Sequence, residues 1–150
     1  MYLGYDQECW KVTTAAATNE ENLSCSHEEA DTRVFLHAKS AAENRKEAVV
    51  IVCEDTDVFV LGVSCADQFS IPIYQKRGTQ NRTRYVNISN IARILGNDVS
   101  KSLPGLHAFT GCDTVSAFSS KGKMTALKLL QSSPQYQMTF NELGTGSEVS

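Results

Sequence analysis

The chain has 150 residues, of which 41% are hydrophobic and 21% are charged. This composition is ordinary for a globular protein, and the length suits one domain with a hydrophobic core. A formal net charge of −3 gives no overall signature of a nucleic-acid-binding protein, so that function would depend on local basic patches and metal ions. No apolar run reaches membrane-spanning length, and nothing at the N-terminus resembles a signal peptide.

The five cysteines are scattered and show no C-x-x-C spacing. They predict reduced thiols in an intracellular protein. The nucleus is a candidate compartment, and the lack of a long apolar run predicts no membrane partner.

The N-terminal part predicts a hairpin followed by a helix. Residues 2–13 read as two short strands, and residues 14–25 are small and polar, which predicts a loop. Ser26 and Glu29 have the spacing of a capping box, and apolar residues follow at helical intervals. The pattern predicts a helix over about residues 27–43.

The most informative stretch is an apolar run that ends in three carboxylates. Residues 49–52 (Val-Val-Ile-Val) show no alternation, which is typical of a strand buried on both faces in a parallel sheet. Glu54, Asp55 and Asp57 follow at once, where ligand and catalytic groups gather in open α/β sheets. A divalent cation would relieve their mutual repulsion. The alternative is a solvated acidic turn, in which Asp57 caps a helix over residues 58–63.

The second half predicts a hairpin and several helices. Residues 71–74 and 84–88 resemble strands around a turn at 78–81, and Pro72 favours an edge position for the first. A short helix should end at Gly96, a second should cover residues 103–109 with Pro104 in its first turn, and a third should follow a turn at residues 119–123. Strands alternating with helices predict an α/β domain with a mainly parallel sheet flanked by helices.

Three acidic groups recur along this predicted fold. Glu29 and Asp31 begin a helix, Asp55 and Asp57 follow the buried strand, and Asp113 follows Thr110-Gly111-Cys112. Clustered carboxylates suit Mg²⁺ or Mn²⁺, and two such ions can activate a water and stabilise the leaving oxygen in phosphodiester hydrolysis. Helix capping is the competing role for Glu29 and Asp57, and a simple turn is the competing role for Asp113.

With these residues in view, the chain resembles the PIN-like, flap-endonuclease-type family of structure-specific nucleases. That family combines an E-A-E-A-like acidic helix, a strand ending in E-D-x-D, and a G-C-D motif followed by a glycine-containing turn and an A-x-K-L-like helix. The matching segments, in the same order over about residues 26–131, are residues 29–31, 54–57, 111–113 and 122–130. Residues 27–32, 55–58 and 109–113 also resemble the H-E-E-A-D-T, D-T-D-V and F-T-G-C-D motifs of a group of uncharacterised animal proteins.

The resemblance implies a PIN-like fold and a nuclease that acts on DNA, including branched or single-stranded forms. The implied metal ligands are Glu29, Asp31, Asp55, Asp57 and Asp113, of which Asp55, Asp57 and Asp113 are the implied catalytic residues. It also implies a helix–turn–helix near the C-terminus that grips the DNA backbone through main-chain amides and a monovalent cation. The residues of this part that would contact nucleic acid are Lys121, Gly122, Lys123 and Lys128, where a helix N-terminus adds a favourable dipole.

Two departures from the family set the expected extent of the domain. Family members begin with a strand that carries another essential aspartate, and nothing upstream of Ser26 matches it; Ser120 stands where the family favours glycine. We therefore expect residues 1–131 to form a partial PIN-like domain, a fragment or decayed copy, and residues 132–150 to form a polar tail or the start of a truncated helix. The alternative function is a non-catalytic domain that keeps the fold to bind nucleic acid or protein.

Two other sets of residues suggest chemistry. Lys76, Arg77, Arg82 and Arg84 would make a basic hairpin that contacts phosphates, or simply a solvated one. His107 and Cys112 suggest a thiol hydrolase, but the sequence identifies no third group to orient the histidine.

Overall fold

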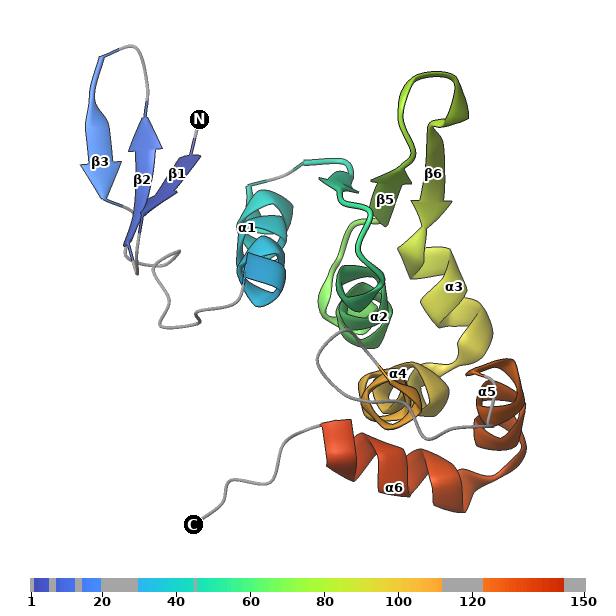
Figure 1. Cartoon of the computed structure of the whole chain (residues 1–150). Helices are drawn as coiled ribbons and strands as arrows, with labels where there is room; N and C mark the ends of the chain where they lie inside the picture. Colours follow the sequence, from blue (N-terminus) through green and yellow to red (C-terminus); the bar gives the residue numbers. More distant parts are fainter. Residues whose placement is uncertain are drawn as a thin grey trace. The chain divides into compact units, whose positions relative to one another are not determined.

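The computed structural model describes residues 2–5, 8–12, 15–19, 30–44, 46–111 and 123–144. The chain divides into two compact units, Met1–Lys46 and Glu47–Ser150. Figure 1 shows the elements of both units, coloured along the sequence. In the described part of the chain, no helix is long and apolar enough to cross a membrane.

The first unit contains a three-stranded antiparallel sheet and one helix. Strands β1 (Tyr2–Tyr5) and β2 (Glu8–Val12) form the predicted hairpin. Strand β3 (Ala17–Asn19) pairs with β2, so the prediction of a loop throughout residues 14–25 is wrong. Backbone pairing with β2 needs no apolar pattern, and the small polar residues therefore gave no strand signal. Helix α1 (Ala30–Glu43) agrees with the predicted helix over its described residues.

The second unit is built on a sheet in the order β4 (Val49–Val52), β5 (Ile73–Arg77) and β6 (Arg84–Asn87). Strand β4 is parallel to β5, whereas β5 and β6 form an antiparallel hairpin. The α/β class is as predicted, but the described strands of this sheet make a mixed rather than a mainly parallel sheet. A short turn, with Gly78 at φ 82° and a 3-10 turn at Gln80–Arg82, returns the chain antiparallel to itself.

The sequence suggested that Pro72 would place β5 at an edge of the sheet, but it does not. It precedes the strand, and its carbonyl accepts a hydrogen bond of 3.0 Å from the Val49 amide. The missing N–H of proline is therefore not needed by the ladder, and β5 occupies the centre of the sheet.

The two faces of this sheet differ in exposure. Ile51, Ile73 and Gln75 are buried on one face, whereas Val50 and Val52 on the other are 48% and 74% exposed. The prediction that β4 is buried on both faces is thus wrong, because an unalternating apolar run does not report which faces are covered.

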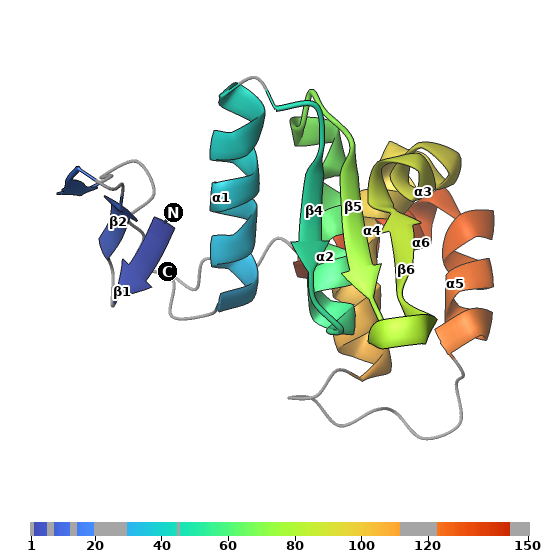
Figure 2. The same cartoon turned by 90° about the horizontal axis from the view of Figure 1, so that it is seen from above.

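Helices cover the buried face in layers. Helix α2 (Thr56–Cys65) packs on α4 (Asn97–Thr110), and α4 packs on α6 (Pro134–Gly144). Figure 1 shows these helices one after another below the sheet, and Figure 2, turned by 90°, shows α2 and α4 behind it. Helix α3 (Ile88–Leu95) contacts β5 and the 3-10 turn Ala66–Gln68 that follows α2.

Helix α3 ends at Gly96 as predicted, but α4 begins six residues before the predicted helix over residues 103–109. Pro104 consequently lies inside the helix and not in its first turn. The early part of α4 escaped the pattern because two of its buried residues are Ser100 and Ser102, and small polar side chains carry no hydrophobic periodicity.

Helices α4, α5 (Lys123–Ser132) and α6 enclose a small core around Val99, Leu106 and Leu130. Ser102 donates a hydrogen bond of 2.8 Å to the Gln137 carbonyl of α6. One turn later, a Cβ at Gly105 would lie 2.0 Å from the Phe140 carbonyl oxygen. Residues 132–150, expected to form a polar tail or the start of a truncated helix, therefore include a helix that begins at Pro134 and packs on α4.

Candidate active site at the end of strand β4

The turn between β4 and α2 is shaped by Asp55. This residue is the N-cap of α2, with extended backbone angles (φ −66°, ψ 137°), and its Oδ1 accepts a 2.8 Å hydrogen bond from the Asp57 amide. The sequence predicted Asp57 as the cap, and the structure places the cap two residues earlier. The Asp55 carboxylate thus accepts from one of the N–H groups that have no partner within the first turn of the helix.

Replacing the cap tests how much of the role of Asp55 is structural. We expect Asp55→Ala to lower the free energy of unfolding by about 1 kcal/mol, because the Asp57 amide loses its acceptor. Asp55→Asn should change it by only a few tenths of a kcal/mol, roughly, because asparagine caps equally well. Urea unfolding of both variants without metal measures the difference; equal losses in the two variants would show that the charge, and not the cap, matters.

Asp57 makes the principal side-chain contact of the site. Its Oδ1 lies 2.6 Å from Nε2 of His107, which projects from the last turn of α4. Their side chains are 33% and 13% exposed, so the pair is partly screened from water. An ionised carboxylate can only accept, so Nε2 carries the hydrogen of this bond and Nδ1 is the remaining ring nitrogen.

Gln75 supports the turn from inside the sheet. Its side chain is fully buried, and Nε2 donates to the carbonyls of Cys53 and Asp55 at 2.9 and 3.1 Å. Its Oε1 is buried and has no hydrogen-bond partner within the described chain. Turning the amide around would bring Oε1 against two carbonyl acceptors, so the two bonds fix its orientation.

Glu54 joins the same turn to the β5–β6 hairpin. Its carboxylate accepts from the Gly78 amide, and its carbonyl accepts from Nη2 of Arg77. Nε of Arg77 also lies 3.9 Å from Oε2 of Glu54. Arg77 is therefore engaged within the protein, whereas Arg82 and Arg84 of the predicted basic hairpin are exposed.

The other predicted site residues are less fully placed. Glu29, Asp113, Lys121 and Gly122 lie outside the described residues, and only the backbone of Asp31 is described, in the first turn of α1. Lys123 begins α5 and Lys128 lies within it, and both side chains are exposed. The turn of the predicted helix–turn–helix also falls outside the described residues.

The site has two carboxylates of the right kind for a metal ion. Among the described side chains, no group of three or more His, Cys, Asp or Glu residues converges as a metal site. Mg²⁺, however, is commonly held by one or two carboxylates, with waters and substrate phosphates completing its shell. Asp55 and Asp57 each use Oδ1 in the bonds given above, and no described residue hydrogen-bonds to Oδ2 of either. Each of these two carboxylates therefore keeps one oxygen outside the described hydrogen bonds.

Two cysteines bear on the thiol chemistry that the sequence suggested, Cys65 and Cys112. Burial raises the pKa of the Cys65 thiol to about 11, so that thiol is protonated at neutral pH and is a poor nucleophile. The structure places Asp57 against Nε2 of His107, a contact that the sequence did not identify. Cys112, the thiol that the sequence paired with this histidine, lies outside the described residues.

Sequence reasoning missed Gln75, and it named His107 only as a partner of Cys112 and not of Asp57. His107 stands 50 residues from its partner Asp57, and Gln75 directly follows the strand that was predicted over residues 71–74. Neither residue carried a local signal of its role, because Gln75 contacts residues 20 and 22 positions away and His107 contacts a residue 50 positions away. No family model, curated protein or solved structure shows a significant match to this chain.

Proposed function

We propose that this protein is a PIN-like, divalent-metal-dependent nuclease domain that hydrolyses DNA phosphodiester bonds. The observation that carries the proposal is the pairing of Asp57 with His107 beside Asp55, at the carboxyl end of β4. Catalytic groups of open α/β sheets collect at this end of a strand. Mg²⁺ or Mn²⁺ bound there supplies electrostatic stabilisation to the phosphate that is being hydrolysed.

The described residues divide the work of such a site. Asp57 would hold the ion, and the hydrogen bond from His107 would orient its carboxylate, since ligating carboxylates are oriented by hydrogen-bonding partners behind them. Asp55 would hold the ion through the carboxylate oxygen that does not cap α2. The resemblance to the nuclease family supplies Glu29, Asp31 and Asp113 as further ligands, and Lys121, Gly122, Lys123 and Lys128 as contacts to the DNA backbone.

The test combines metal binding with DNA cleavage. Mn²⁺ or Mg²⁺ should raise the melting temperature of the wild type by several degrees in a thermal melt. This is roughly the effect of a ligand present at about a hundred times its dissociation constant. Asp57→Asn should lose this shift and reduce cleavage of flap and single-stranded DNA by a factor of about 100 or more. Asp98→Asn, which neutralises an exposed acid in the first turn of α4, is the control and should behave as the wild type.

His107→Gln separates orientation from ligation. It should lower the affinity for the ion by a factor of about 10, as expected for a partner behind the ligand. The metal-dependent shift in melting temperature should therefore become smaller but not disappear. Cleavage that persists in Asp57→Asn, or that needs no divalent ion, would contradict the proposal.

A non-catalytic binding domain is the second candidate, and the capping role of Asp55 favours it. A carboxylate whose visible role is to begin a helix needs no metal. This function predicts DNA binding with no metal-dependent melting shift and no cleavage. Replacing Lys123 or Lys128 with glutamine should then reduce the slope of log affinity against log salt by about 1 for each phosphate that the lysine neutralises.

A further inference from the structure

A second candidate site lies at the opposite end of α2 from Asp55 and Asp57. A pocket of about 370 Å³ opens between the end of α2, helix α3 and the start of α4. This volume is in the range of pockets that hold small molecules. Because α2 rises about 1.5 Å per residue, the end of the helix lies roughly 12 Å along its axis from Asp57. The pocket is therefore distinct from the candidate active site.

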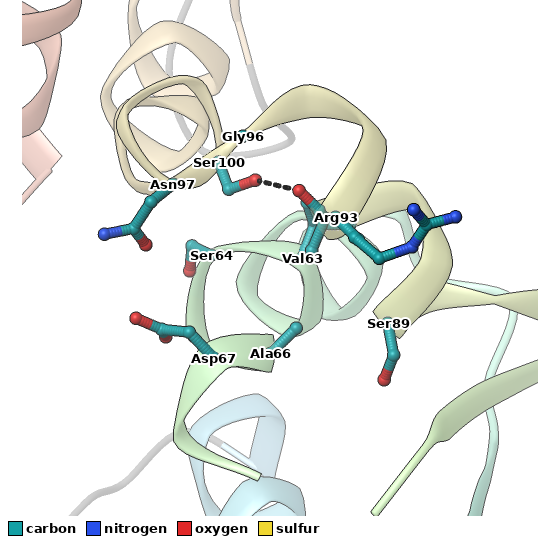
Figure 3. Close-up of a pocket in the computed structure, with 10 residues that line it drawn as sticks. Val63, Ser64, Ala66, Asp67, Ser89, Arg93, Gly96, Asn97 and Ser100 are labelled. Atoms are coloured by element: carbon teal, nitrogen blue, oxygen red, sulfur yellow. Dashed lines mark hydrogen bonds between the residues drawn. The ribbon is translucent and has the colours of Figure 1, made fainter. Parts of the chain in front are cut away.

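Polar side chains from all three elements line the pocket, and Figure 3 shows them around it. They are Ser64, Asp67, Ser89, Arg93, Asn97 and Ser100. The apolar lining residues are small, and none of the described lining residues is aromatic. A lining of this kind favours a hydroxylated ligand over a flat aromatic one, which would need a stacking partner.

The existing hydrogen bonds show what the serines can offer a ligand. Ser89 Oγ accepts from the Ile73 amide at 2.9 Å, so its own O–H remains to donate. Ser64 donates to the Leu61 carbonyl at 2.8 Å and Ser100 donates to the Ala92 carbonyl at 3.3 Å, which leaves the lone pairs of both oxygens as acceptors. The pocket therefore presents both donors and acceptors to hydroxyl groups.

The charges of the pocket are arranged on different sides. Asp67 pairs with Lys101 at 3.1 Å, and both side chains are about two-fifths exposed, so the carboxylate is held in place and keeps capacity to accept. Arg93 donates through Nη2 to Asn90 at 2.8 Å, and its guanidinium has further N–H donors for an anion.

The start of α4 lies on the same wall of the pocket. Gly96 is the N-cap and offers no side-chain cap to the first amides of the helix. Its φ of 84° suits glycine, and a Cβ placed there would meet nothing within 4 Å, so the space in front of it is open. These amides add positive potential near Arg93.

We propose that this pocket binds a small hydroxylated anion, a phosphate or carboxylate that carries several hydroxyl groups. The anionic group contacts Arg93 and the hydroxyl groups contact Asp67, Ser64 and Asn97. Ser100 as an acceptor and Ser89 as a donor complete the recognition of the hydroxyl groups.

Calorimetric titration of the full chain tests this with defined probes. Ribose 5-phosphate supplies a phosphate source, gluconate supplies a carboxylate source, and ribose and inorganic phosphate supply the two halves separately. At least one hydroxylated anion should bind tenfold or more tightly than either half. Whichever of ribose 5-phosphate and gluconate binds more tightly identifies the anionic group that the pocket prefers.

Three variants locate the binding. Arg93→Gln should weaken binding of the hydroxylated anion at least tenfold, and Asp67→Asn should weaken it severalfold by removing the acceptor for hydroxyls. Arg84→Gln is the matched control, because it removes an exposed arginine outside the pocket. Circular dichroism confirms that each variant is folded.

Three outcomes would overturn the inference. Equal binding of inorganic phosphate and ribose 5-phosphate would mean that only charge is recognised. Equal losses in Arg93→Gln and Arg84→Gln would mean a diffuse surface effect. Absence of binding by every probe at millimolar concentration, with the protein folded, would show that the pocket does not take this class of ligand. None of these results depends on divalent metal or on DNA cleavage, so the nuclease proposal stands or falls separately.

Discussion

Gln75→Glu is expected to lower the free energy of unfolding by at least about 3 kcal/mol, although it exchanges one amino group for one oxygen. The wild-type Nε2 donates to the Cys53 and Asp55 carbonyls from a fully buried position. A carboxylate there would face two acceptors, lose both bonds and remain without a counter-charge among the described contacts of the site. Urea unfolding measures the loss, and Gln68→Glu, at an exposed position in the turn after α2, is the control with the same chemical change.

The same variant connects the sheet to the candidate active site. Because Gln75 holds the Asp55 carbonyl, its loss should release the turn that presents Asp55 and Asp57. Gln75→Ala should cost about 3 kcal/mol as well, because it removes two hydrogen bonds and leaves an unfilled space. A stability within about 0.5 kcal/mol of wild type in both variants would contradict the supporting role of this side chain.

Gly105→Ala is expected to lower the free energy of unfolding by about 2–3 kcal/mol, against a gain of about 1 kcal/mol from helix propensity. The added Cβ would lie 2.0 Å from the Phe140 oxygen and 2.9 Å from its carbonyl carbon. Both atoms belong to the backbone of α6, so no side-chain rotation relieves the clash. The helix must move away from α4, and the rings of Phe109 and Phe140, which meet edge-on at 5.5 Å, should separate.

Limited proteolysis with chymotrypsin distinguishes displacement of α6 from general loosening. Tyr136 and Phe140 lie within α6 and should be cleaved faster in Gly105→Ala at temperatures where the protein remains folded. Lys101→Ala, one turn earlier in α4 and at a partly exposed position, should leave the cleavage rate near that of wild type. Unchanged cleavage in Gly105→Ala would mean that α6 does not depend on the close approach at this glycine.

Helix α4 links this packing to the candidate active site. It carries Gly105 and Ser102 toward α6 and His107 toward Asp57. A shift of α4 caused by Gly105→Ala should therefore also weaken the metal-dependent stabilisation proposed for Asp55 and Asp57. His107→Gln should weaken it without exposing α6 to protease, which separates the two effects.

Local sequence signals determined most of the elements in the described chain. The hairpins of residues 2–13 and 71–88, helix α1 and the end of α3 at Gly96 followed from alternation, capping residues and turn glycines. These signals act between residues a few positions apart, so the sequence displays them directly. The acidic cluster after β4 was visible for the same reason.

Only the tertiary structure decided which groups meet and what each carboxylate does. Asp55, and not Asp57, caps α2, because the backbone of the turn aims its Oδ1 at the Asp57 amide. Asp57 is thereby left to meet His107, a residue 50 positions away that no local pattern connects to it. Gln75 and Gly105 acquired their roles from the approach of the β4–α2 turn and of α6, respectively. The exposed face of β4 and the length of α4 were likewise set by packing, since hydrophobic periodicity records where burial is favourable and not what covers it.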